Sequence, residues 1–434
     1  MASINEKETF EIINKIEQAE LSKLTLELAK IPSPRGYEKE VGDYLYEWMR
    51  KEGFYCFKQQ VAENRYNVIG ILKGDSGSPK LIFNAHMDTR LWHPDDVWIM
   101  GDDIKYYIEY EGKEEGEFLV GDGVVNDKGP MAAFLTAVKA IKDSGIKLEG
   151  DIIMTCVIGE IDQTPVDEFQ GTKYEGQGYG TRHLITHGIF GDYAVVAECT
   201  NFSISRAEAG NCWFKINVFG KGGIYTPWIE RPYRFEENPN AIYKASYVIQ
   251  AIEEWAAEYE KRNSLEFEDG VIVPKVNIGA IRGGLPYRIS QTPGVCSIYV
   301  DVRLNPTQSP LEVRKELESV IKKTGVEYTI ETYLYHQGYI ANKVDRLIES
   351  VKKAHESVLG YPPKKVLTPY CSMWRDINVF NEYKIPAITY GPTTYVYKNI
   401  GRAGIRALKK QELLQVSKIY GLIALDICKG IHKK

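Results

Sequence analysis

The sequence predicts an α/β protein with a central mixed sheet covered by helices on both faces, interrupted by an inserted α+β domain. Over residues 1–205, short apolar runs alternate with amphipathic helical segments, which is typical of such a sheet. Near residue 206 the pattern changes to longer strands with a period of two and only two long helices. The first pattern returns at about residue 341. We therefore expect residues 1–205 and 341–434 to form one discontinuous domain and residues 206–340 to form the insertion.

The first part of the chain supplies the elements of the sheet in order. Helical spacing over residues 5–30 ends at a proline cluster and Gly36, and a second helix is expected over roughly residues 38–52. Another helix, with an apolar face, is expected over residues 130–145. Short apolar runs bounded by polar or turn residues predict buried strands. These runs are FYCFKQQV, NVIGILKG, KLIFNAH, DIIMTCVIGE at 151–160 and YAVVAECT at 193–200.

The inserted segment has a different order of elements. A long amphipathic helix is expected over residues 240–262, and SPLEVRKELESVIKKTG predicts a second helix. Strands are predicted in NCWFKINVFGKGG, KVNIGAIRGG, VCSIYVDVRL and VEYTIETYLY. This order indicates a small α+β sandwich with an antiparallel sheet. Beyond it, a helix ending at Leu359, a strand in IPAITYG and a final helix over residues 409–428 complete the α/β domain.

The composition narrows the class of protein. The 434 residues carry a net charge of −5 and contain no basic block, which argues against a nucleic-acid partner. The seven cysteines are scattered and form no CxxC pair, which favours a reducing cytoplasm over a disulfide framework. The first residues predict a charged amphipathic helix, not a signal peptide or a membrane span. We therefore expect a cytoplasmic protein without a membrane partner.

Chemically useful side chains follow the ends of the predicted strands. His86 ends an apolar run, and Asp127 follows a glycine-rich stretch. Glu160 and Glu198 each end a later strand. In α/β sheets ligands bind at the carboxyl ends of the strands, so these side chains are expected to share one site. An imidazole is a good zinc ligand when its second ring nitrogen is fixed, and Asp88, two residues after His86, is placed to do this.

An ordered set of motifs resembles a known family. These motifs are IPSPRGYE, HMD, GDGVVNDKG, IGE, AECT, IRGG, DVR and IPAITYGP. Together they resemble the zinc-dependent amidohydrolases and exopeptidases that include acetylornithine deacetylase, succinyl-diaminopimelate desuccinylase, aminoacylase and carboxypeptidase G. The resemblance covers nearly the whole chain. It implies a catalytic metal-binding domain and an inserted lid domain that dimerises, and hence a homodimer acting on a small-molecule substrate.

The resemblance also implies roles for individual residues. His86, Asp127 and Glu198 would hold a divalent metal, with Asp127 as the bridge where two ions are present. Asp88 would orient His86, and Glu160 would be the general base. One imidazole and two carboxylates leave a position for water, as in a catalytic site. Zinc is the expected metal, with manganese or cobalt as alternatives and one or two ions per chain.

Two departures from the family fall on the same metal position. Ile161 stands where the family has the second glutamate of a pair, and residues 391–410 lack the histidine expected after the GP turn. Because both missing groups would bind one ion, we expect a mononuclear site. The alternative is a rearranged second site that uses Asp162 or His183. Arg402 or Arg406 is a candidate for a fixed positive charge in the vacated position.

The predicted lid departs as well. Residues 224–226 stand where the family has a histidine, and Arg288 replaces an asparagine. Tyr287, Arg288 and Arg303 are candidates for binding an anionic substrate, because a guanidinium group forks onto carboxylates. The rival interpretation of Arg303 is an ion pair with a structural carboxylate. Nearer the site, the bulky Trp374 lies in a loop with Arg375 and Asp376 where the family has small residues, which would narrow the pocket.

We expect a metal-dependent hydrolase that cleaves a C–N bond, of the amide, N-acyl or peptide type, in a small anionic substrate. One alternative is hydrolytic removal of an amino group from an aromatic or cyclic amine on the same metal. A second alternative, from another class, is a metal-poor pseudoenzyme that acts as a binding protein. The lost second metal position favours the last alternative, and the intact set of five acidic and imidazole side chains weighs against it.

Overall fold

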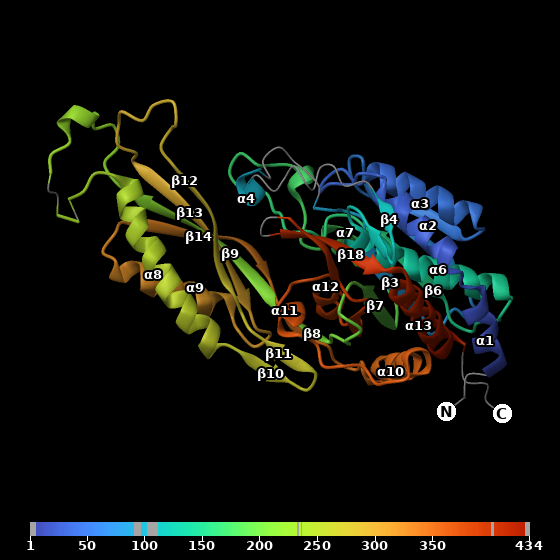
Figure 1. Cartoon of the computed structure of the whole chain (residues 1–434). Coiled ribbons are helices and arrows are strands. Elements are labelled where there is room, and N and C mark those ends of the chain that lie inside the picture. The colour runs from blue at the N-terminus through green and yellow to red at the C-terminus, as the bar shows by residue number, and fades with distance from the viewer. Residues whose placement is uncertain are drawn as a thin grey trace. The chain divides into compact units, whose positions relative to one another are not determined.

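The computed structural model describes residues 6–90, 97–101, 112–231, 234–235, 237–400 and 403–429, and it divides into two compact units (Figure 1). Unit 1 comprises Met1–Arg206, Ala341–Val366 and Arg375–Lys434. Unit 2 comprises Ala207–Ile340 and Leu367–Trp374. The α/β and α+β classes predicted from the sequence are confirmed.

Unit 1 is built on a six-stranded mixed sheet with the order β1-β2-β6-β3-β7-β16. The strands β6, β3, β7 and β16 are parallel to one another, and β1 and β2 run antiparallel at one edge. Because the parallel strands are neighbours, their carboxyl ends lie along one edge. The bounds are β1 Tyr55–Ala62, β2 Arg65–Leu72, β3 Leu81–His86, β6 Ile152–Val157, β7 Tyr193–Ala197 and β16 Ala387–Tyr390.

Helices cover both faces of this sheet. Successive side chains along a strand point to opposite faces, and apolar side chains on both faces need to be buried. Phe83 of β3 packs in a large core with residues of α2, α3, α6, α10 and α13. Its neighbour Ile82 points to the other face and packs with Leu184 of α7 and Phe380 of α12. The helices are α1 Glu6–Lys15, α2 Gln18–Ala29, α3 Lys39–Lys51, α4 Val97–Met100, α6 Gly129–Ser144, α7 Tyr179–Thr186, α10 Asp345–Leu359, α12 Ile377–Glu382 and α13 Lys410–Cys428. None of the described helices is long and apolar enough to cross a membrane.

Smaller elements complete unit 1. The single helix expected over residues 5–30 is two helices, because Glu17 is extended between them. The segment that lacks the expected histidine forms a hairpin, which pairs with β5 in a second sheet of order β17-β18-β5-β4. These elements are β4 Lys113–Glu115, β5 Phe118–Val120, β17 Tyr395–Ile400, β18 Ala403–Lys409, η3 Val124–Lys128 and η4 Thr172–Tyr174.

Unit 2 is an antiparallel sheet of order β12-β13-β9-β14 with α8 and α9 packed on one face (Figure 1). Asn240 begins α8 as predicted, because its side chain accepts hydrogen bonds from the next two free backbone N–H groups. The bounds are β8 Ala207–Glu208, β9 Gly210–Phe219, η5 Thr226–Trp228, α8 Ala241–Arg262, β10 Leu265–Phe267, β11 Gly270–Ile272, β12 Val276–Gly283, β13 Val295–Leu304, α9 Pro310–Lys323, β14 Tyr328–His336, β15 Tyr339–Ile340 and α11 Thr368–Cys371.

The segment Leu367–Trp374 belongs to unit 2, whereas the sequence analysis placed it in the discontinuous α/β domain. Hydrogen bonds explain the difference. The backbone N–H of Ala209 donates to the carbonyl of Cys371, and the N–H of Val273 donates to the Ser372 hydroxyl. Nothing in the local sequence pattern marks this return of the chain.

A buried ion pair anchors the first motif of the chain, IPSPRGYE. The guanidinium of Arg65 donates to both carboxylate oxygens of Glu38, at 2.9 and 2.6 Å, and each residue is about 1% exposed. The hydroxyl of Ser33 in the same motif donates to the carbonyl of Met87 at 2.8 Å. The motif therefore supports the loop that follows His86 from outside the site.

Replacing Glu38 should destabilise the protein strongly. We expect Glu38→Ala to lower the free energy of unfolding by about 3–5 kcal/mol, because it leaves the Arg65 charge buried and unpaired. Chemical denaturation of wild type and variant measures this. Glu47→Ala is the matched control, since Glu47 pairs with Arg50 at the surface and should cost no more than about 0.5 kcal/mol. Equal losses in the two variants would contradict the structural role of the buried pair.

Candidate metal centre

His86 ends β3 and is held in one ring orientation. It is 1% exposed, and its Nδ1 lies 2.8 Å from the backbone carbonyl oxygen of Asp88. A carbonyl only accepts hydrogen bonds, so Nδ1 is the donor and Nε2 is the nitrogen that faces the site. The imidazole is therefore oriented as a potential ligand that presents Nε2 to the site.

Asp88 supports the site through two different groups. Its backbone carbonyl orients His86, while its carboxylate lies 3.6 Å from Nδ1 of that ring. The two carboxylate oxygens accept the backbone N–H groups of Glu160 and Ile161, at 3.1 and 2.8 Å. Asp88 thus fixes the loop that carries Glu160 as well as the imidazole. The sequence pattern alone suggested that Asp88 supports His86, but not that it binds the backbone of Glu160 and Ile161.

Asp127 enters the site from the segment that leads into α6. The chain turns sharply at Gly123, whose φ is +70°, a conformation that favours glycine. A Cβ atom at Gly123 would lie 2.6 Å from Cγ2 of Thr89, so a larger residue does not fit. The backbone N–H of Lys128 donates to the carbonyl of Gly123 and closes the turn. These contacts explain the glycines of GDGVVNDKG and leave Asp127 fully buried.

Glu198 follows β7 at the same edge of the sheet and is 5% exposed. The chain passes close behind it at Gly391, where a Cβ atom would lie 2.2 Å from the Glu198 carbonyl oxygen. The glycine after IPAITY is therefore required by the close approach of two backbones. This close contact fixes the backbone position of Glu198.

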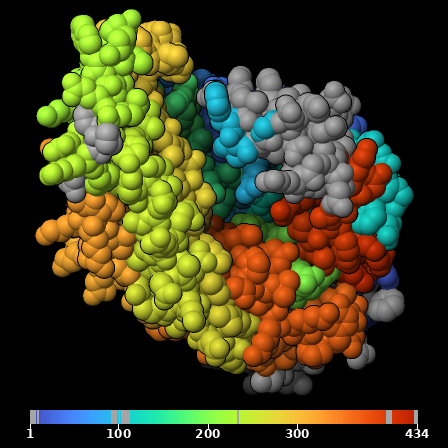
Figure 2. Space-filling model, turned by 60° about the vertical axis from the view of Figure 1, so that its left-hand side comes forward, coloured from blue at the N-terminus to red at the C-terminus, as the bar shows by residue number. Residues whose placement is uncertain are grey.

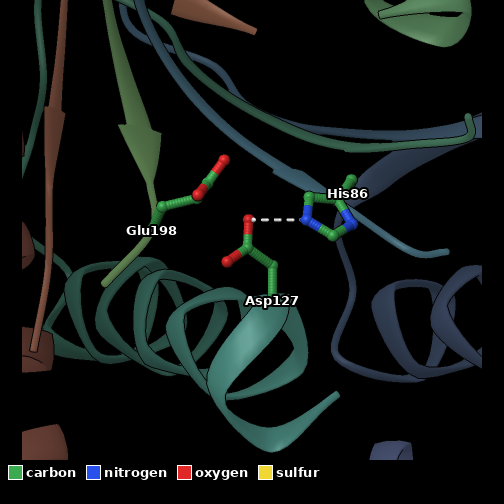
Figure 3. Close-up of side chains that lie close together, drawn as sticks. All are labelled: His86, Asp127 and Glu198. Carbon is green, nitrogen blue, oxygen red and sulfur yellow. Dashed lines mark ion pairs between the residues drawn. The ribbon is translucent and has the colours of Figure 1, made fainter. Parts of the chain in front are cut away.

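The three predicted ligands converge. One ligand atom from each of His86, Asp127 and Glu198 lies within 4.8 Å of the other two, and Figure 3 shows the three side chains pointing toward a common space. Nε2 of His86 lies 3.6 Å from an Asp127 oxygen. In the part of the chain that the structure describes, this is the only such cluster of three or more potential ligands.

The cluster fits a divalent cation. Nε2 of His86 and both oxygens of Asp127 are buried and have no hydrogen-bond partner among the described residues. Burial and the nearby Glu198 raise the pKa of Asp127 well above its usual range, because its charge is poorly solvated there. A bound cation would satisfy the lone pairs and offset the charge. One imidazole and two carboxylates form a donor set suited to zinc, manganese or cobalt.

Glu160 adjoins the cluster. One of its carboxylate oxygens lies 3.6 Å from Nε2 of His86, and the residue is 8% exposed. Burial raises the pKa of Glu160 well above its usual range, and the charges of Glu198 and Asp376 add to the effect. A carboxyl group in such surroundings holds a proton more readily than one in water.

The sequence analysis missed two further residues of the site. Nε of Arg375 lies 2.5 Å from a Glu198 oxygen, and Arg375 is buried. The next residue, Asp376, accepts hydrogen bonds from Asn84 and Thr181, at 2.9 and 2.6 Å. Burial raises the pKa of Asp376 to about 6. Their loop was noted for its bulk, but the sequence holds no signal that aims Arg375 at Glu198.

The residues considered for a second metal position do not join the cluster. Asp162 is exposed and accepts a hydrogen bond from Gln177. His183 stacks on His187 on α7, with ring centroids 3.6 Å apart. Arg406 is exposed on β18 and does not provide the buried positive charge suggested above, because its strand turns that side chain outward. Arg402 lies outside the described residues.

The candidate substrate-binding residues all lie in unit 2. Tyr287 is 85% exposed and Arg288 is exposed, in the turn after β12. The guanidinium of Arg303 on β13 donates to a carboxylate oxygen of Asp301, which matches the rival interpretation of a structural ion pair. A substrate-binding role for these three residues remains a prediction.

A buried imidazole and two converging carboxylates, beside a carboxyl group able to hold a proton, define a metal-dependent hydrolase. Residues 82–410 match Peptidase family M20/M25/M40, and the chain belongs to this family. It is a hydrolase that acts on C–N bonds, as the predicted reaction requires.

Individual relatives agree with this assignment. The chain is 26% identical over 330 residues to N-formyl-4-amino-5-aminomethyl-2-methylpyrimidine deformylase of Bacillus subtilis, covering 71% of this chain and 68% of that protein. A tripeptidase from Staphylococcus aureus has the same fold, with a TM-score of 0.66, 19% identity and coverage of 95% and 99% of the two chains. A Bacillus subtilis protein described as a dinuclear metal binding peptidase of the M20 family also has this fold, with a TM-score of 0.61 and 14% identity. The match covers 95% of this chain and 99% of that chain.

Replacing a ligand should weaken metal binding. We expect Asp127→Asn to bind a divalent ion at least ten times more weakly than wild type, because an amide carries no charge. Dialysis against a metal buffer followed by elemental analysis measures the bound ion. His187→Ala, at the exposed histidine that follows α7, is the control and should retain metal as wild type does. If the Asp127 variant binds metal as tightly as wild type, Asp127 is not a ligand of the ion.

Proposed function

We propose that the chain is a mononuclear metal hydrolase that cleaves the amide or N-acyl bond of a small anionic substrate. The observation that carries this proposal is the cluster of His86, Asp127 and Glu198, whose ligand atoms lie within 4.8 Å of one another. The apolar Ile161 follows Glu160 and is 5% exposed, so it adds no ligand on that side. This supports one ion per chain rather than two.

The chain's own residues supply the remaining steps. When bound, a divalent ion supplies Lewis-acid chemistry, which acidifies water and polarises a carbonyl group. Glu160 accepts the proton of the attacking water and later delivers it to the leaving nitrogen. Asp88 holds the backbone of Glu160 and so sets the position of this base. The buried surroundings strengthen every charge interaction during the reaction.

Zinc is the proposed metal, with manganese or cobalt as alternatives. Two carboxylates and one imidazole suit all three ions, and the described site holds no thiolate that would select zinc more strongly. The nearest cysteine in sequence is Cys199, whose thiol donates to the carbonyl of Val125. Burial raises the pKa of that thiol, so it stays protonated and is a poor ligand.

The substrate class is proposed from charge and from the relatives. The Bacillus subtilis relative is named as the deformylase of a small N-formyl compound, which supports a small N-acyl substrate. Arg288 is exposed and is the proposed contact for a substrate carboxylate, with Tyr287 beside it. Arg303 is a weaker candidate, because Asp301 already engages its guanidinium.

We also propose a homodimer formed through unit 2. The edge strand β12 exposes most of its residues, including Ile281 at 51%. Its loop continues with Leu285 and Ile289, and pairs with the loop of Trp228 through hydrogen bonds between Thr226 and Ser290. These two loops appear in lime and yellow-orange at the upper left of Figure 2. An unpaired strand edge with apolar side chains is suited to pairing with a second copy.

The proposed location is the cytoplasm. All seven cysteines are free, and six of them are buried. Free thiols persist in a reducing compartment, where disulfides are rare. The charge of −5 gives no support for binding to nucleic acid or to an anionic membrane surface.

Replacing the proposed base tests the reaction. We expect Glu160→Gln to lower turnover by about 10²- to 10⁴-fold with unchanged metal content, because the amide cannot take the proton. Substrates are sought first in a panel of N-formyl and N-acyl amino acids, dipeptides and aromatic amines. Glu382→Gln, at a surface ion pair with Arg182, is the control. Wild-type turnover by the Glu160 variant would refute the assignment of Glu160 as the base. If the wild-type protein turns over only the aromatic amines, the reaction is deamination and not amide cleavage.

A charge on the edge strand should separate the two copies. We expect Ile281→Lys to convert a dimer into a monomer, because a buried unpaired ammonium group disfavours strand pairing. Light scattering coupled to size-exclusion chromatography gives the mass of each form. Leu311→Lys, at an exposed position on α9, should leave the mass unchanged. A monomeric wild-type protein would contradict the proposed interface.

A further inference from the structure

Arg375 places a permanent positive charge inside the metal centre. The residue is 4% exposed, and its Nε donates to a Glu198 carboxylate oxygen at 2.5 Å. A guanidinium group stays charged at every pH at which proteins fold. Glu198 is one of the three proposed ligands, so the guanidinium lies directly against the cluster. Arg375 is therefore part of the electrostatics of the whole cluster.

If all of them were ionised, the buried acidic groups of the site would carry more negative charge than one divalent ion offsets. Asp127, Glu160, Glu198 and Asp376 are each at most 8% exposed, and all four are carboxyl groups. His86 directs its Nδ1 to the Asp88 carbonyl and would offer Nε2 to the ion. A single divalent ion offsets two negative charges, and burying uncompensated charge is costly. The guanidinium of Arg375 supplies one more positive charge in the same place.

We propose that Arg375 takes the electrostatic role that a second ion would have, and that it restricts the centre to one divalent ion. This inference rests on the mononuclear site proposed above. The guanidinium occupies one side of Glu198, which then cannot offer that oxygen to another cation. It also repels any cation that approaches from its own side. The apolar Ile161, next to Glu160, offers no ligand that would compensate for this repulsion.

Neighbouring contacts hold Arg375 in position. Its carbonyl accepts the backbone N–H of Asn378 in the first turn of α12, at 3.0 Å. The adjacent Asp376 is fixed by Asn84 of β3 and Thr181 of α7. The start of α12 is thereby tied to the strand that carries His86. A flexible surface arginine would give no such fixed charge, so burial and these contacts distinguish Arg375 from an incidental ion pair.

Metal titration of charge variants tests the inference. Zinc and manganese are each titrated into metal-free protein by calorimetry, with stoichiometry confirmed by elemental analysis. We expect wild type to bind one ion, and Arg375→Met to bind its first ion at least tenfold more tightly, because the repulsion is gone and Glu198 is released. Arg375→Lys retains the charge and should stay within about threefold of wild type. A folded Arg375→Met variant with unchanged or weaker affinity overturns the proposal.

A second variant keeps the test decisive if Arg375→Met does not fold. Ile161→Glu adds a potential ligand while Arg375 remains, and we expect it still to bind one ion per chain. Two ions in Ile161→Glu overturn the exclusion of a second cation by Arg375. Two ions in wild type overturn both this inference and the mononuclear site, and no ion in wild type overturns the metal-dependent function itself. One ion in wild type with no effect of Arg375→Met refutes this inference alone.

Discussion

The structure depends on one constraint: several carboxyl groups and an imidazole are buried together at a position that fits a cation. Burial raises the pKa of Asp127, and a bound ion or a nearby guanidinium would favour its charged form. Several surrounding contacts hold these groups in place. Asp88 fixes the Glu160 backbone, Ser33 fixes the loop after His86, and Gly391 allows the chain to pass behind Glu198.

The topology of the sheet explains why distant residues meet. The strands β6, β3 and β7 are adjacent and parallel, so the residues at their carboxyl ends lie in the order Glu160, His86 and Glu198. Asp127 reaches the same edge from the turn before α6. A protein with antiparallel neighbours at these positions would send alternate strand ends to opposite edges. The parallel arrangement is thus the step that turns separate motifs into one site.

The sequence predicted what depends on local pattern and missed what depends on tertiary contacts. Apolar runs ending in His86 and Glu198 revealed both the strands and the edge at which ligands gather. The apolar pattern predicted a helix over residues 240–262, and α8 spans Ala241–Arg262. The contact between Arg375 and Glu198 joins residues 177 positions apart in sequence, and no local sequence pattern predicts it. For the same reason the segment Leu367–Trp374 was assigned to the wrong unit.

The apolar Ile161 and the buried Arg375 have a common electrostatic explanation. A glutamate in place of Ile161 would add another buried negative charge beside Glu160, with nothing but a second ion to offset it. Conversely, an arginine against Glu198 would raise the cost of holding two divalent ions in the same small space. Each change makes the other easier to accommodate. An apolar Ile161 and a buried Arg375 therefore form one consistent solution to the charge balance, in which a guanidinium and one ion together serve the cluster.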